Sequence, residues 1–143
     1  MTLKQLIKIE DKAKQVWVIS PYLHYDLQNK DFSELDSVNL GEKTKYRYIV
    51  PAHPDIHKNI DVYRKKYSLS EEEVSRQFLI LPENDFTPFL MEIAIYDAHE
   101  ECIACAAPGI HGENEVIRFD DQTAAAMAKS FRSIWKKYKR EKL

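Results

Sequence analysis

The chain has 143 residues, 44% of them apolar and 31% charged, which is typical of one globular domain long enough to bury a sizeable core. Its net charge of −2 excludes a strong overall attraction to nucleic acid or to a membrane surface. No apolar run reaches membrane-spanning length, the charged N-terminal stretch lacks a secretory apolar core, and two cysteines do not make a disulfide framework. We therefore expect a single cytoplasmic domain, residues 1–143, with no membrane partner.

The first third of the chain predicts a helix and a strand followed by a less regular region. Within Thr2–Lys14, apolar residues have helical spacing and Thr2 can cap the helix. Val16–Ser20 is apolar and β-branched and stops at a proline, which predicts a buried first strand. Tyr22–Gly41 is polar and mixed, and we expect at most weak helical content around Phe32–Val38.

The middle third alternates strands with helices. Lys45–Val50 alternates in polarity and predicts a second strand. His57–Tyr67 carries a helical stripe of apolar residues, and the capping-box spacing of Ser70 and Glu73 starts a short helix over Glu71–Arg76. Phe78–Leu81 predicts a third strand.

Two apolar runs near residue 100 organise the rest of the chain. Leu90–Tyr96 and Cys102–Ala107 are each as long as a strand and are joined by a polar link, which predicts a hairpin at the centre of a sheet. Glu92 is the anomaly, because an ionised carboxylate in a buried strand is costly without a partner. We expect that partner to be a basic or hydrogen-bonding group, with Arg47 and Lys45 as candidates.

The last elements complete the fold class. Val116–Phe119 predicts another strand, and a final amphipathic helix begins after Asp120 or Asp121. Its polar side carries a basic stripe, formed by Lys129, Arg132, Lys136 and Arg140. The order of elements predicts an α/β domain with a mixed sheet and helices on both faces. The two cysteines lie three residues apart in a strand and point to opposite faces, so we expect structural thiols.

The central hairpin also carries a family resemblance. The phospholipase D superfamily has the signature His-x-Lys, four residues, Asp, six residues, Gly-Ser-x-Asn. This chain keeps the spacing from Leu90 onward but holds leucine and glutamate at the His and Lys positions. Asp97 matches, while Cys105 and Ala107 replace the Ser and Asn. The chain thus resembles one degenerate phospholipase D-like half.

The resemblance implies a function without that chemistry. The family reaction needs the histidine nucleophile and the lysine, and a glutamate at the lysine position would repel a phosphodiester. We therefore expect no catalytic residue, and a non-catalytic module that binds a small ligand or a protein partner as a regulatory domain. Tyr22, His24, Tyr25 and Asp26 follow the first strand, where α/β sheets place ligands, so a pocket there is one expectation. The expected binding residues are Tyr22 and His24 from this segment, together with Leu90, Glu92 and Asp97.

The resemblance also implies a binding partner, and the sequence leaves two alternative functions open. The family pairs two motif-bearing halves, which implies a homodimer with Leu90 at the contact, near Tyr22–Tyr25 and Gly109–Gly112. The 3 glycines form no phosphate-binding loop motif and no strong metal-ligand spacing is present, so we expect no cofactor and no metal site. The main alternative is nucleic-acid binding by the basic stripe of the last helix. A third possibility is that the chain is an enzyme whose active-site motif is not recognised in the sequence.

Overall fold

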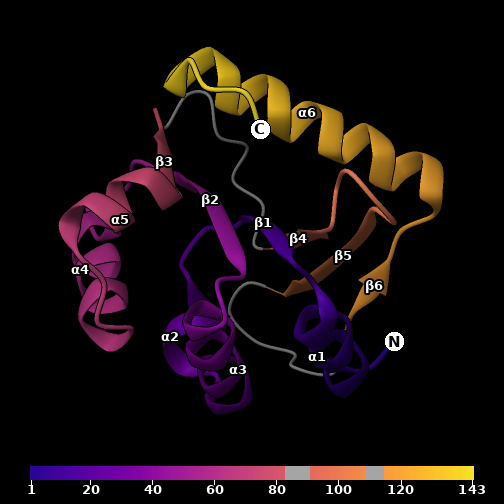
Figure 1. Cartoon of the computed structure of the whole chain (residues 1–143), viewed down its shortest axis with the longest axis horizontal. Coiled ribbons are helices and arrows are strands. Elements are labelled where there is room, and N and C mark those ends of the chain that lie inside the picture. Colours follow the sequence, from indigo (N-terminus) through magenta and orange to yellow (C-terminus); the bar gives the residue numbers. More distant parts are fainter. Residues whose placement is uncertain (83–90, 109–114) are drawn as a thin grey trace.

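A computed structural model describes residues 1–82, 91–108 and 115–143. These residues form a six-stranded sheet in the order β3-β2-β1-β4-β5-β6 (Figure 1). The strands are β1 (Gln15–Ile19), β2 (Lys45–Pro51), β3 (Phe78–Leu81), β4 (Met91–Tyr96), β5 (Ile103–Pro108) and β6 (Ile117–Arg118).

The sheet has a parallel half and an antiparallel half that meet at β1. On one side, β1 pairs in parallel with β2, and β2 with β3. On the other side β1 pairs with β4, β4 with β5 and β5 with β6, all antiparallel. The mixed sheet and the predicted hairpin, β4 and β5, are therefore confirmed. The register sets Val18 opposite Ala94 and Glu92 opposite Ala107.

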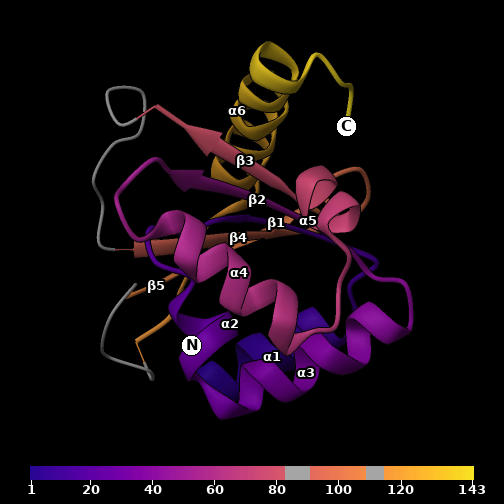
Figure 2. The same ribbon diagram turned by 90° about the vertical axis from the view of Figure 1, so that its left-hand side faces the viewer.

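Helices cover both faces of the sheet, as predicted, but unequally. Helices α1 to α5 lie on one face, and α6 crosses the other (Figures 1 and 2). The helices are α1 (Leu3–Lys12), α2 (His24–Gln28), α3 (Lys30–Gly41), α4 (Ile56–Lys66), α5 (Glu71–Gln77) and α6 (Asp121–Lys139). Within the ranges described, no helix is long and apolar enough to cross a membrane.

Local signals explain most of these boundaries. Thr2 and Ser70 form capping boxes at the starts of α1 and α5, and Asp120 caps α6 through the amide of Thr123. Because side chains alternate along β2, Tyr46, Tyr48 and Val50 face α1 to α5 while Ile49 faces α6. Two separate cores result, one on each face.

The segment 22–41 departs from the prediction. It forms two helices, α2 and α3, where we expected at most weak helical content. The usual apolar stripe is weak in α3 because much of its buried side is polar. Phe32 is buried there, but so are Ser33, Asp36 and Asn39. This polar lining belongs to the candidate site.

Candidate functional site

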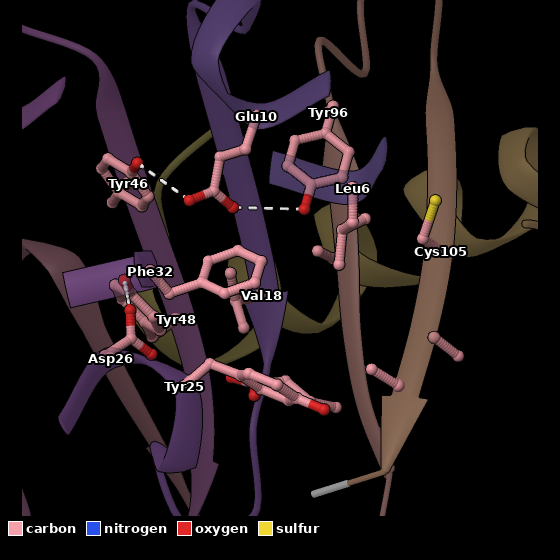
Figure 3. Close-up of a pocket in the computed structure, with 14 residues that line it drawn as sticks. Leu6, Glu10, Val18, Tyr25, Asp26, Phe32, Tyr46, Tyr48, Tyr96 and Cys105 are labelled. Carbon is pink, nitrogen blue, oxygen red and sulfur yellow. Dashed lines mark hydrogen bonds between the residues drawn. The ribbon is translucent and has the colours of Figure 1, made fainter. Parts of the chain in front are cut away.

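A cavity lies between the sheet and the helices of the α1 to α5 face (Figure 3). Its volume of about 30 Å³ is room for one or two water-sized groups. Three carboxyl groups line it, from Glu10 on α1, Asp26 on α2 and Glu92 on β4. The lining tyrosines are Tyr25, Tyr46, Tyr48 and Tyr96. The cavity therefore combines acids with aromatic rings and phenol hydroxyls.

Four acids are buried at this site, the fourth being Asp36 on α3 behind the cavity wall. Their exposed fractions are 4% for Glu10, 6% for Asp26, 1% for Asp36 and 7% for Glu92. In the part of the chain that the structure describes, none of the four is ion-paired with a Lys, Arg or His. Buried carboxylates are normally paired, so this group is unusual.

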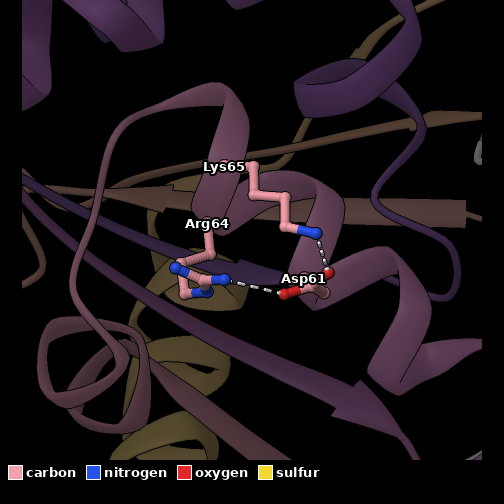
Figure 4. A network of polar contacts seen from close by, with 3 residues as sticks. All are labelled: Asp61, Arg64 and Lys65. Carbon is pink, nitrogen blue, oxygen red and sulfur yellow. Dashed lines mark hydrogen bonds and ion pairs between the residues drawn. The ribbon is translucent and has the colours of Figure 1, made fainter.

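A surface acid of the same chain shows the usual arrangement. Asp61 lies 3.1 Å from the guanidinium of Arg64 and 2.9 Å from the ammonium of Lys65 (Figure 4). These two cations hold the pKa of Asp61 below its ordinary value. The buried acids have hydroxyl and amide neighbours in place of such cations.

Glu10 and Asp36 share too few donors for two carboxylates. Tyr96 donates to Glu10 Oε1 at 3.1 Å, and the hydroxyl of Tyr46 lies 3.3 Å from Glu10 Oε2 and 3.2 Å from Asp36 Oδ1. Asn39 donates to that same hydroxyl at 3.1 Å. Because Tyr46 has a single proton, it can satisfy one carboxyl at a time. The pair therefore needs a proton of its own.

The second oxygen of Asp36 supports the same conclusion. Asp36 Oδ2 is buried and receives no hydrogen bond from a neighbouring donor. The Asp36 carboxyl also interacts with the carboxyl groups of Glu10 and Asp26, and a hydrogen bond between two carboxyl groups needs a proton on one of them. Burial raises the pKa of Asp36 well above its ordinary value, and the negative charges of Glu10 and Asp26 raise it further. Burial also raises the pKa of Glu10, to about 6.

Asp26 accepts hydrogen bonds at both its carboxyl group and its main-chain carbonyl. Tyr48 donates to Asp26 Oδ1 at 2.8 Å, and Tyr63 of α4 donates to the Tyr48 hydroxyl at 3.5 Å. The main-chain carbonyl of Asp26 accepts from Tyr67 and, at 3.0 Å, from Ser33. Burial nevertheless outweighs these hydrogen bonds and raises the pKa of Asp26.

Glu92 is buried and hydrogen-bonded, as the sequence predicted, but its partners are not cations. Burial raises its pKa well above the ordinary value, while hydrogen bonds from Ser20 and from the main chain of Tyr25 act in the opposite direction. Oxygen Oε2 of Glu92 is buried without a hydrogen-bond partner among the residues that the structure describes. One carboxyl oxygen at the cavity is thus left unsatisfied.

The predicted partners of Glu92, Arg47 and Lys45, were wrong. Both lie on β2 at positions that alternate with Tyr46 and Tyr48, so they point away from the cavity. The guanidinium of Arg47 donates to the carbonyl of Tyr46 at 2.8 Å and interacts with the charge of Glu141 instead.

We expected the segment after β1 to contribute to a site. Two of its residues, Tyr25 and Asp26, line the cavity. Tyr22 is 42% exposed and its ring lies 5.4 Å from that of His53. His24 Nδ1 lies 3.2 Å from the side-chain oxygen of Gln28. Neither Tyr22 nor His24 lines the cavity, whereas Tyr25 and Asp26 do.

The turn itself explains this placement. Ser20 Oγ accepts from the amide of Leu23 at 2.8 Å, and Leu23 has a left-handed φ of 58° at the start of α2. This tight turn brings the first residues of α2 back over β4, where Ser20 and Tyr25 meet Glu92.

Two positions of the phospholipase D-like spacing, Glu92 and Asp97, do not come together. Leu90 lies outside the described residues. Glu92 and Asp97 stand near opposite ends of β4, roughly 16 Å apart at about 3.3 Å per residue. Asp97 Oδ1 accepts from the amides of Lys14 (2.9 Å) and Gln15 (3.0 Å), which ties the hairpin to the start of β1. Asp97 is therefore engaged by main-chain donors.

The basic stripe on α6 is only partly free. Lys129, Lys136 and Arg140 are exposed. Arg132 is half-buried, with its guanidinium 5.9 Å from the ring centre of Trp17. Packing under the helix accounts for that contact, because Trp17 also stacks on Phe131 at 5.1 Å.

The chemistry available at the cavity is limited to acids, phenols and one thiol. Among the residues described, no three His, Cys, Asp or Glu side chains are placed to hold a metal ion. Cys105 lines the cavity, and burial raises its pKa to about 11, so the thiol stays protonated near neutral pH. Cys102 packs against the core on the other face, so the two thiols are unpaired and lie on opposite faces as predicted, but only Cys105 is buried and Cys102 is half-buried.

Sequence reasoning missed Glu10 and Asp36. A signal for Glu10 was present, because Leu3, Leu6 and Glu10 share one side of α1 and all three are buried. An acid on the apolar side of a helix is a site candidate by the same logic that singled out Glu92. Asp36 gave no comparable signal, since α3 itself was not recognised.

Comparison with known proteins gives no match to any family model, curated protein or solved structure. The site is therefore interpreted from its own residues.

Proposed function

We propose that this chain is a regulatory module that binds a small polar ligand in the cavity between β4 and helices α1 to α3. The observation that carries the proposal is Glu92 Oε2, a buried oxygen at a cavity wall with no hydrogen-bond partner within residues 1–82, 91–108 and 115–143. A ligand group in the cavity could satisfy it. Buried polar atoms normally have a partner, and an unpaired one costs about 1–3 kcal/mol.

Binding fits this site better than turnover. The one thiol at the cavity stays protonated near neutral pH because burial raises its pKa to about 11. The carboxyl groups are likewise held toward their neutral forms by burial. A protonated thiol and a neutral carboxylic acid are weak nucleophiles, and the acid can both donate and accept a hydrogen bond.

The cavity volume sets the size of a suitable probe. About 30 Å³ accommodates roughly two non-hydrogen atoms, which gain at most about 3 kcal/mol and so bind with a Kd on the order of 10 mM. At about 100 mM, such a probe stabilises the folded chain by about 1.4 kcal/mol, or a few degrees in Tm. Methylammonium, methanol and formate are suitable, each at matched ionic strength.

The test compares these probes on the wild type and a variant with a filled cavity. Ala94 lines the cavity, so Ala94→Val should abolish the Tm increase. Ala104→Val is the matched control, because Ala104 is buried on the opposite face against α6. If Ala94→Val does not fold, Val18→Ile fills the cavity by one methyl group. No Tm increase with any probe, or equal increases in wild type and filled variant, would contradict the proposal.

Other expectations remain predictions beside this proposal. The phospholipase D-like ancestry is supported only by the spacing of residues from Leu90 onward. The prediction of a homodimer depends in turn on that ancestry. A cytoplasmic location agrees with two free cysteines. Nucleic-acid binding by α6 is not carried further, since one of its four predicted residues, Arg132, packs over Trp17.

A further inference from the structure

We infer that the ligand of this cavity presents an ammonium group, so that the site recognises the head of a primary amine. This inference rests on the proposed function and names the chemical class of its ligand. Three observations carry it: the charge of the groups around the cavity, the nature of its walls and its size.

The groups around the cavity could supply negative charge from several elements. Carboxyls reach it from α1, α2 and β4, in Glu10, Asp26 and Glu92, and Asp36 of α3 lies behind them. The other titratable groups facing them are phenols of α2, β2, α4 and β4, and the thiol of Cys105 on β5.

A cation of the chain itself acts on the cluster from outside. Lys66 lowers the pKa of Asp26, but its ammonium donates to the carbonyl of Leu27 at 3.0 Å in an exposed position. Within residues 1–82, 91–108 and 115–143, no ion pair fills the space between the acids. A positive ligand group would be the counter-charge of a carboxylate that forms in this cluster, whereas an anionic ligand would oppose the ionisation of all four acids.

The walls and the volume favour an ammonium over a metal ion. An –NH3⁺ group has three donors and is close to a water molecule in size, which suits a cavity of about 30 Å³. The unpaired carboxyl oxygen Oε2 of Glu92 and aromatic rings from Tyr25 and Phe32 line the space. No three acids among the described residues have an arrangement that would hold a metal.

Amine binding must release a proton. In the empty site burial holds Asp36 and Glu92 toward their protonated forms, because it raises both pKa values well above the ordinary range. When R–NH3⁺ enters, one carboxylic acid gives its proton to the buffer, and the resulting carboxylate accepts a hydrogen bond from the ammonium. The affinity should therefore rise with pH, by up to about ten-fold per pH unit, while the amine stays protonated.

The experiment is an NMR titration of the full chain with methylammonium, methanol, formate and Mg²⁺ at constant ionic strength. We expect methylammonium to shift the amides around the cavity with a millimolar Kd, and methanol and formate to bind at least about ten-fold more weakly. The affinity for methylammonium should increase between pH 5.5 and 8. Glu92→Gln should weaken it by about ten-fold or more. Glu34→Gln, on the exposed side of α3, should leave it unchanged.

The possible failures are distinguishable. If methanol or formate binds in the cavity as well as methylammonium does, the amine assignment is wrong but the proposed function stands. If Mg²⁺ shifts the same amides at lower concentration, the ligand is a metal ion and the amine assignment is again wrong. If no probe shifts the cavity amides, both the inference and the proposed function fail. An affinity that does not change with pH contradicts the release of a proton.

Discussion

Substitution of Glu10 by glutamine should make the stability of the fold less dependent on pH. Glu10 is 4% exposed, and burial raises its pKa from the ordinary 4.5 to about 6. The folded chain therefore binds this proton more tightly than the unfolded chain does. The associated stability is fully present below pH 4.5 and is lost as the pH rises through about 6.

The expected magnitude follows from this shift. A change of about 1.5 pKa units, at about 1.36 kcal/mol per unit, corresponds to about 2 kcal/mol. Glutamine is neutral at every pH and keeps an oxygen that can accept from Tyr96. The loss of unfolding free energy between pH 4.5 and 7 should thus be about 2 kcal/mol smaller in Glu10→Gln than in the wild type.

Urea unfolding at several pH values measures this difference. The fluorescence of Trp17 and Trp135 reports unfolding, because both side chains are buried. Asp11→Asn is the matched control, since Asp11 is the next residue on α1 and is exposed. The reasoning is refuted if wild type and Glu10→Gln lose stability in parallel, or if Asp11→Asn flattens the dependence as much.

Further expected outcomes concern single residues and assembly. Glu92→Gln should cost less unfolding free energy than Glu92→Leu, because leucine leaves the donors of Ser20 and Tyr25 unpaired; equal losses in urea unfolding would contradict this. Asp97→Ala should lower the free energy of unfolding by about 1–3 kcal/mol, since the amides of Lys14 and Gln15 lose their acceptor. Asp97→Asn should lower it less, because asparagine keeps a side-chain oxygen and tolerates the φ of 46° at this position. Light scattering should give a homodimer, with Leu90→Asp weakening it; a mass near 16.8 kDa across micromolar concentrations excludes pairing. Bis-p-nitrophenyl phosphate should not be hydrolysed, and turnover that is lost on mutation of a histidine would show otherwise.

Much of the fold could be predicted from local patterns. β3 was predicted at its observed bounds, and α1 and α5 begin directly after the predicted caps, Thr2 and Ser70. These elements have strong period or capping signals. The pairing of β1 with both β2 and β4 could not be predicted, because strand order depends on long-range packing that no local pattern specifies.

Only part of the candidate site could be predicted from the sequence. Glu92 stood out because an acid interrupted an apolar strand, and it is indeed buried. Its partners were misassigned because sequence alone did not establish which face of the sheet Glu92 and Arg47 each point to. Asp36 was missed because a helix whose buried side is polar lacks the period that identifies helices.

The most direct test of the central claim is the protonation of the four buried acids. Side-chain carboxyl carbon resonances of Glu10, Asp26, Asp36 and Glu92 report each group separately, and they can be followed from pH 4 to 9 with and without methylammonium. The account predicts that at least one of the four, Asp36 or Glu92, remains protonated at pH 7 in the empty protein and that methylammonium lowers the pKa of a carboxyl in the cluster. Four carboxyls that are all ionised at pH 7, with titrations unchanged by methylammonium, would contradict it.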